Sequence, residues 1–138
     1  MSEHRDQSAD ASVVAATERL SAAFAARDVD AALACFVTDH DIGYVGSENG
    51  ENAAGRTAVE ALFKNLFARD EAYSWQVTNA LVREYGDGAY LFAQADGLAH
   101  TDAGQTVPFA YRISGILENL DGSWKWRHCH GCEPAGEG

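Results

Sequence analysis

The sequence predicts an α+β fold, in which three N-terminal helices pack on the concave face of a curved, cone-shaped antiparallel sheet. Two observations support this prediction. Between residues 12 and 67, apolar side chains recur at steps of three and four, the spacing of an amphipathic helix. From residue 73 onward they alternate with polar side chains, the spacing of a strand. Helices followed by a run of strands are typical of α+β proteins.

The three helices occupy the first half of the chain. The first is expected to begin near Ser12, with Asp10 or Ser12 itself as the cap, and a shorter one follows Asp28. Their apolar positions are Val13, Ala16, Leu20, Ala23, Phe24, Val29, Leu33 and Phe36. Thr57 and Glu60 form a capping box that predicts the start of the third helix, which carries an apolar stripe through residues 62–67.

Strands account for most of the remainder. They are expected at residues 42–45, 73–85, 89–100, 106–117 and 123–132, with residues 46–55 as a loop. The strongest turn signals are Gly86-Asp87-Gly88 and Asp121-Gly122. Helices laid across a long curved sheet leave a hollow between the two layers, and such a hollow is the default position of a ligand site.

Composition and charge limit the class of protein. The chain has 138 residues, of which 46% are hydrophobic and 22% charged, which fits one globular domain and excludes a disordered chain. We expect this domain to span residues 12–134, with flexible tails at 1–11 and 135–138. The net charge of −11 argues against nucleic acid and anionic membranes as partners.

The chain is also expected to stay in the cytoplasm with reduced thiols. Its first twelve residues are polar and lack the apolar segment of a signal peptide. No apolar run approaches the length of a membrane span. Three cysteines are an odd number for a disulfide framework.

Three segments together resemble the nuclear transport factor 2-like (NTF2-like) superfamily, and within it the SnoaL-like domains. They are ERLSAAFAARDVDAALACF, GRTAVEALFKNLF and YRISGILENLDGSWKWRHCHGCEP, and the resemblance covers residues 12–134. It implies a cone-shaped fold, a homodimer formed through the outer face of the sheet, and a cavity that serves many unrelated chemistries. The superfamily includes isomerases, cyclases and dehydratases as well as non-catalytic association domains, so the fold alone does not fix a function.

Two branches of the superfamily can be compared residue by residue. The tyrosine of the ketosteroid isomerases falls at Leu20, their base at Tyr44, and their protonated aspartate near Ser114 or Gly115, so their chemistry is not carried over. The association domains share the ending W-x-x-x-H-x-H, here Trp124, His128 and His130. Their pocket arginine would fall near Gly115, so the shared ending does not imply a shared ligand.

The predicted catalytic residues are His128, His130 and Asp96. An unbroken strand period puts both histidines on one face with Trp124, Trp126 and Cys132, and histidine exchanges protons near neutral pH. Asp96 alternates with aromatic residues that would raise its pKa by desolvation. The alternatives are histidines with a structural or interfacial role, and an Asp96 exposed near the end of its strand.

The predicted ligand-binding residues are Tyr44, Trp75, Tyr111, Arg112, Trp126 and Glu48. The aromatic ones would form the cavity wall or, alternatively, ordinary core, and Glu48 would line the rim or lie in solvent. Arg112 could hold an anionic group. Strand parity puts Arg112 on the face opposite the histidines unless a bulge, which Gly115 or Pro108 could supply, intervenes.

No metal or organic cofactor is predicted. A metal at His128, His130 and Cys132 would need a fourth ligand from elsewhere, such as Asp96 or His100. The Cys129–Cys132 pair has redox spacing but lies on a strand rather than at a helix start. No nucleotide-binding loop is present.

The sequence therefore predicts a protein that binds a small molecule. The first hypothesis is an enzyme that isomerises, cyclises or dehydrates its ligand by general acid–base catalysis. The alternative is a non-catalytic dimeric module for ligand binding or assembly. Histidines and an Asp96 that point out of the cone, into a subunit interface, would favour the module.

Overall fold

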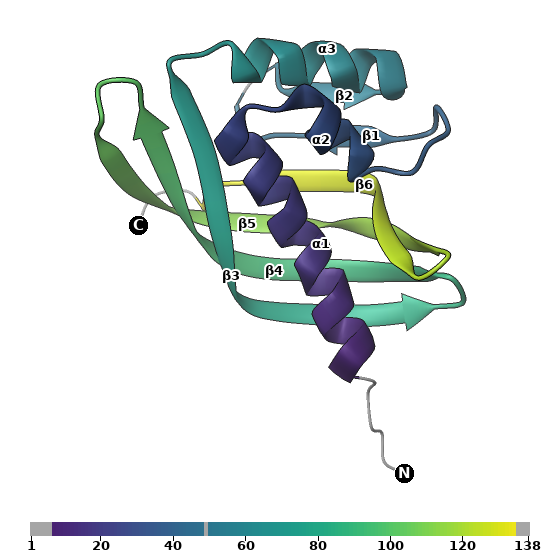
Figure 1. The fold of residues 1–138 in the computed structure, drawn as a ribbon. Coiled ribbons are helices and arrows are strands. Elements are labelled where there is room, and N and C mark those ends of the chain that lie inside the picture. The colour runs from purple at the N-terminus through teal and green to yellow at the C-terminus, as the bar shows by residue number, and fades with distance from the viewer. Residues whose placement is uncertain (1–6, 49, 135–138) are drawn as a thin grey trace.

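The computed structural model describes residues 7–48 and 50–134, and it contains three helices against one curved sheet (Figure 1). The helices are α1 (Gln7–Ala26), α2 (Val29–Ala34) and α3 (Arg56–Phe67). The strands are β1 (Gly43–Val45), β2 (Asn52–Ala54), β3 (Glu71–Tyr85), β4 (Gly88–Thr101), β5 (Thr106–Leu120) and β6 (Ser123–Cys132). The predicted α+β class is confirmed.

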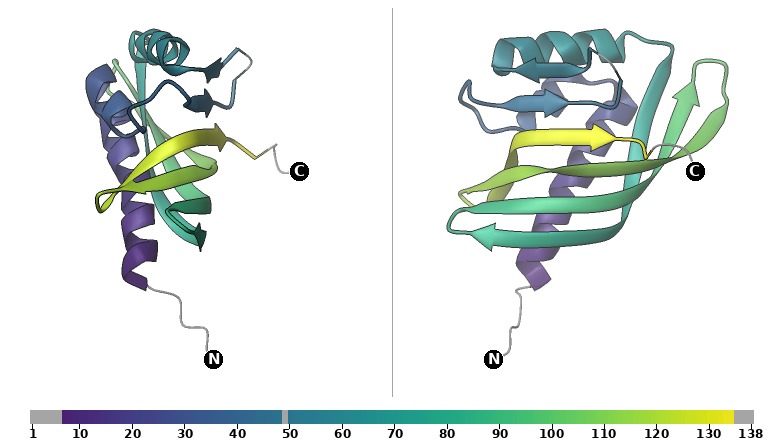
Figure 2. Two further views of the ribbon diagram at one scale, coloured as in Figure 1. Left: turned by 90° about the vertical axis from the view of Figure 1, so that its right-hand side faces the viewer. Right: turned by 180° about the vertical axis from the view of Figure 1, so that it is seen from behind.

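The sheet has the order β2-β1-β6-β5-β4-β3. All neighbouring strands are antiparallel except β1 and β6, which are parallel. The four long strands curl without closing, and α1 runs across their concave face, as the turned views show (Figure 2). α3 lies beside β1 and β2 (Figure 1). The result is an open cone with helices on its inner side.

Three local predictions differ from the structure. α1 begins at Gln7, earlier than the expected start at Ser12, so the predicted N-terminal tail is partly helical; residues 1–6 and 135–138 lie outside the described part of the chain. α3 is capped by Gly55 without a side-chain bond, because the helix starts at Arg56 and Thr57 falls inside its first turn. The expected loop at 46–55 contains β2, which folds back on β1.

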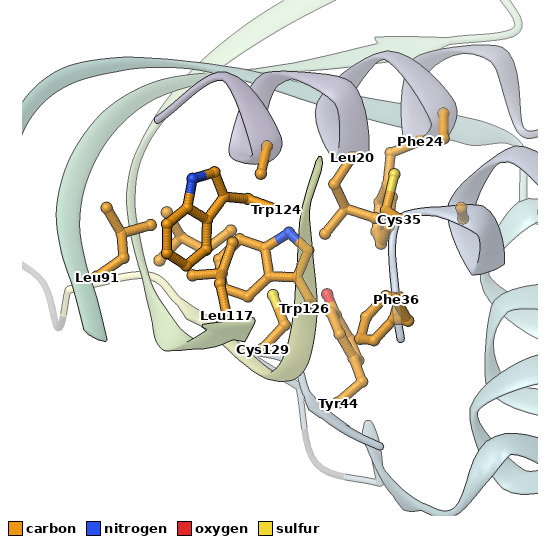
Figure 3. Packing of buried hydrophobic residues seen from close by; sticks show 14 of the residues in the cluster. Leu20, Phe24, Cys35, Phe36, Tyr44, Leu91, Leu117, Trp124, Trp126 and Cys129 are labelled. Carbon is orange, nitrogen blue, oxygen red and sulfur yellow. The ribbon is translucent and has the colours of Figure 1, made fainter. Parts of the chain in front are cut away.

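The core fills the space between α1 and the sheet (Figure 3). Trp126, which was predicted to bind ligand, is fully buried there, with Leu20, Leu117 and Tyr44 close by (Figure 3). Phe36 and Phe63 extend the cluster toward α3, their rings 5.9 Å apart. The prediction for Trp126 is therefore corrected: its ring is part of the packed core and does not line the interior pocket described below.

A buried serine attaches α1 to the free edge of the sheet. β3 is the last strand in the sheet order, so one side of its backbone has no partner strand. The hydroxyl of Ser21 donates to the carbonyl of Trp75 at 2.9 Å and accepts from the Trp75 amide at 2.8 Å. Both backbone groups are thus satisfied where α1 covers the edge, and the Trp75 ring is held in place.

Replacing Ser21 with Ala is expected to lower the free energy of unfolding by about 2 kcal/mol, because two backbone groups of Trp75 would remain buried without partners. Urea unfolding measures this loss, and amide hydrogen exchange should show reduced protection at Trp75. Ser114→Ala, at a half-buried serine on the other face of the sheet, should change stability by less than about 0.5 kcal/mol. Equal effects of the two variants would contradict this role for Ser21.

Candidate functional site

A β-bulge in β6 decides which side chains face the interior. Leu117 pairs with Trp126, but Ile116 pairs with His128, so Arg127 is an extra residue in β6. One extra residue reverses the alternation of side chains along a strand. Before the bulge Trp124 and Trp126 point inward, and after it Cys129 does. The prediction of one shared face from Trp124 to Cys132 is wrong because it assumed an unbroken period.

The side chain of the bulged residue is held by two carboxylates. Arg127 makes a two-pronged contact with Glu118, with distances of 2.9 Å from Nε and 2.8 Å from Nη2. Its Nη1 contacts Asp39 at 2.6 Å. These contacts raise the pKa of Arg127, and the hydrogen bond from Arg127 is the main reason why the pKa of Asp39 is lowered. The extra residue therefore links β6 to β5 and to the segment that precedes β1.

The predicted catalytic residues lie on the outer face of the sheet. His128 and Asp96 are exposed, and His130 is half-buried. Arg112 is also exposed on this outer face. Because of the bulge, the even-numbered residues of β5 point to the same side as the even-numbered residues at the end of β6. The bulge thus brings Arg112 to the side of the histidines, but that side faces away from the interior. None of the four lines the interior pocket.

The interior pocket opens between α1, α3 and the inner face of the sheet. It is lined by Phe24, Tyr44, Ser47, Glu48, Glu51, Leu66, Tyr73, Trp75, Phe109, Tyr111 and Glu133. The space open to the centre of a water molecule is about 50 Å³, whereas one water needs roughly 10–15 Å³ on this measure. The pocket thus holds several waters or one compact organic molecule. Four predicted ligand-binding residues meet here: Tyr44, Trp75, Tyr111 and Glu48.

Six aromatic rings of the pocket form a continuous series of contacts. The series runs Tyr73, Phe109, Tyr111, Trp75, Phe24, Tyr44, with neighbouring ring centres 5.2 to 6.3 Å apart. Three of these five contacts are edge-to-face, a preferred geometry of aromatic pairs, and the other two are tilted. The rings belong to α1, β1, β3 and β5, so the fold has to form before this wall exists.

Glu51 is a pocket residue that the sequence analysis missed. It precedes β2, and only 8% of its surface is exposed. Its Oε2 lies 3.4 Å from Nη1 of Arg69, the same atom that contacts Glu48 at 3.1 Å. Burial, followed by the charge of Glu48, raises the pKa of the Glu51 carboxyl. A carboxyl of this kind binds and releases a proton more readily near neutral pH than an exposed one.

Gly46 is the one feature of the sequence that could have indicated that the Glu51 carboxyl lies close to the chain at the end of β1. The amide of Gly46 donates to the carbonyl of Glu51 at 2.6 Å, which closes the turn between β1 and β2. A Cβ at Gly46 would collide with Oε1 of Glu51. A glycine that immediately follows a short strand is therefore the residue that leaves room for the carboxyl.

Two buried tyrosine hydroxyls complete the polar groups of the pocket. Burial is the main cause that raises the pKa of both Tyr44 and Tyr111. The nearby Tyr111 adds to the rise in the pKa of Tyr44. The hydroxyl of Tyr111 lies over Gly131, where a Cβ would collide with it. Both groups stay neutral donors at physiological pH.

No metal-binding cluster is seen in the described residues, and two of the three cysteines are buried thiols. No group of three or more His, Cys, Asp or Glu side chains among them could hold a metal ion. Cys35 and Cys129 are buried free thiols, and burial raises the pKa of both. Among the helices of residues 7–48 and 50–134, none is long and apolar enough to cross a membrane.

The open cone of helices and curved sheet matches the NTF2-like fold. Residues 13–135 match the SnoaL-like domain, and the chain belongs to this family. The predicted resemblance is thereby confirmed. No functionally curated protein matches the sequence.

Solved structures similar to this chain carry different names. A candidate dehydratase of the NTF2-like family from Streptomyces avermitilis has a TM-score of 0.80 at 16% identity, over 96% of this chain and 100% of that one. A candidate aromatic ring hydroxylase from Novosphingobium aromaticivorans has a TM-score of 0.79 at 20% identity, covering 96% and 94%. A candidate calcium/calmodulin-dependent kinase II association domain from Xanthomonas campestris has a TM-score of 0.75 at 16% identity, covering 97% and 91%. At these identities the likeness concerns the fold alone.

Proposed function

We propose that this chain binds a compact organic molecule in the interior pocket and isomerises, cyclises or dehydrates it by general acid–base catalysis. The observation that carries the proposal is the buried Glu51 carboxyl, with its raised pKa, in one pocket with the Tyr44–Tyr111 hydroxyl pair. This set takes the role that the sequence assigned to His128, His130 and Asp96. Similar folds named as candidate dehydratases agree with this class of reaction.

The two kinds of group suit complementary steps. Ionised Glu51 can remove a proton from a carbon beside a carbonyl group of the ligand, and the electron pair moves onto the carbonyl oxygen. The neutral hydroxyl of Tyr111 can donate a hydrogen bond to that oxygen. Return of the proton to a different carbon completes an isomerisation. Departure of a neighbouring hydroxyl group, protonated to water, completes a dehydration.

Native mass spectrometry of the purified protein tests the proposal. A retained small molecule is expected, and incubation with more of it should give an isomer, a cyclised product or a product that has lost one water. A molecule that is retained but recovered unchanged would contradict catalysis. An empty pocket, combined with no conversion of compact carbonyl compounds, would contradict the proposal as a whole.

One observation favours the second candidate function, a non-catalytic dimeric module. The large apolar side chains exposed on the outer face of the sheet include Tyr90 (42%), Phe92 (46%) and Ile116 (47%), which lie beside the predicted catalytic residues. Large apolar side chains gathered on one face are typical of a contact surface. Outward-facing histidines and Asp96 are the arrangement that the module hypothesis requires, although a second subunit is needed to complete it.

Phe92→Asp is expected to convert a homodimer into a monomer, since it puts a charge in the centre of this apolar face. Sedimentation velocity measures the change, and Asp87→Asn, in the exposed β3–β4 turn, is the control. If both variants keep the same sedimentation coefficient as the unmodified chain, the outer face does not form the dimer.

A further inference from the structure

The pocket combines an aromatic wall with an excess of negative charge. Three carboxylates line it: Glu48, Glu51 and Glu133. The nearest cation, Arg69, contacts Glu48 and Glu51 but does not itself line the pocket. No lysine, arginine or histidine of the described chain is among the lining residues. Two carboxylates thus share one arginine, and Glu133 adds a further negative charge.

The aromatic wall is suited to a positive charge. The faces of tyrosine, tryptophan and phenylalanine rings carry partial negative charge, and cages of such rings hold ammonium groups in proteins. Six rings in continuous contact, from Tyr73 to Tyr44, form the wall here. A carboxylate ligand would instead meet Glu48, Glu51 and Glu133 with no lining cation to balance it.

We infer that the ligand of this pocket is a compact organic cation that carries an ammonium group. The inference rests on the proposed function and names its substrate class. The six rings and the carboxylates of Glu48, Glu51 and Glu133 hold the cationic group. Neutral and anionic molecules of the same shape bind more weakly.

Three probes of nearly equal shape and different charge test the inference. They are choline, its neutral carbon analogue 3,3-dimethylbutan-1-ol, and the anion 3,3-dimethylbutanoate, each titrated by NMR at 0.15 M salt to screen the net charge of the chain. Choline is expected to bind at least about tenfold more tightly than the alcohol, and the anion not at all.

Matched variants separate the site from general attraction of cations. Glu51→Gln and Glu48→Gln should each weaken choline binding about tenfold, whereas Glu84→Gln, at an exposed position of β3, should not change it. Equal binding of choline and the alcohol would overturn the inference. So would an unchanged choline affinity in both pocket variants, or no choline binding at all.

These failures differ from a failure of the proposed function. If the purified protein retains and converts a neutral molecule, general acid–base catalysis in the pocket stands and the cationic substrate class is wrong. If choline binds as expected but no retained compound is ever converted, the ligand class stands and catalysis is wrong.

Discussion

Glu51→Gln is expected to lower turnover of the retained compound by about 100-fold or more, because the amide keeps the shape of the side chain but cannot exchange a proton. Steady-state kinetics on that compound measure the loss, which should fall on kcat. Glu84→Gln, the same substitution at an exposed position of β3, should leave kcat unchanged. Wild-type kcat in Glu51→Gln would exclude Glu51 as the proton-transfer group.

The same variant should gain stability relative to the wild type as the pH rises. The pKa of Glu51 is raised in the folded state by burial and by Glu48, so its contribution to stability is full below its unfolded value of about 4.5 and is lost as the pH passes the folded value. Glutamine has no such loss. Urea unfolding at pH 4 and pH 8 gives the free energy of unfolding of Glu51→Gln minus that of the wild type. This difference should be more positive at pH 8 than at pH 4. A shift in the opposite direction would mean that the contact with Arg69 outweighs burial.

The periodicity of apolar residues was sufficient to predict the helices, the long strands and the class of fold. The three-and-four spacing around Leu20 and Phe63 identified helices, and the alternation after Tyr73 identified the long strands, because both patterns follow from burying one face of a regular element. Tyr44, Trp75 and Tyr111, which the sequence analysis put in the cavity wall, are buried in the structure. Local sequence carries this information because each side chain's direction depends only on its own element.

The composition of the site could not be obtained in the same way. The position of His128 depends on the register between β5 and β6, which is set by contacts between residues distant in sequence. Glu51 looked like a loop residue because β2 is only three residues long and exists through its pairing with β1. The bulge in β6 puts His128 and His130 on the outer face of the sheet, and the short β1–β2 hairpin brings Glu51 to the interior pocket.

Gly115→Ala is expected to lower the free energy of unfolding by about 3 kcal/mol, which corresponds to a fall in Tm of about 10 °C. Gly115 faces the bulge of β6, and its φ of 156° is rarely adopted by other residues. A Cβ at this position would collide with the carbonyl oxygen of His128 and lie 2.9 Å from the ring of Trp126. Neither neighbour can move easily, since the first is backbone within the sheet and the second is fully buried. Urea and thermal unfolding measure the effect.

Gly88→Ala is the matched control because its Cβ would lie 3.5 Å from the nearest atoms, at ordinary contact distance. It should be neutral or slightly stabilising, since alanine restricts the unfolded chain more than glycine does. If Gly115→Ala were as stable as Gly88→Ala, the close approach of β5 to the bulge would be wrong. Without the bulge, the side chains of β6 would alternate regularly. His128 and His130 would then point to the same side as Trp126, into the cone.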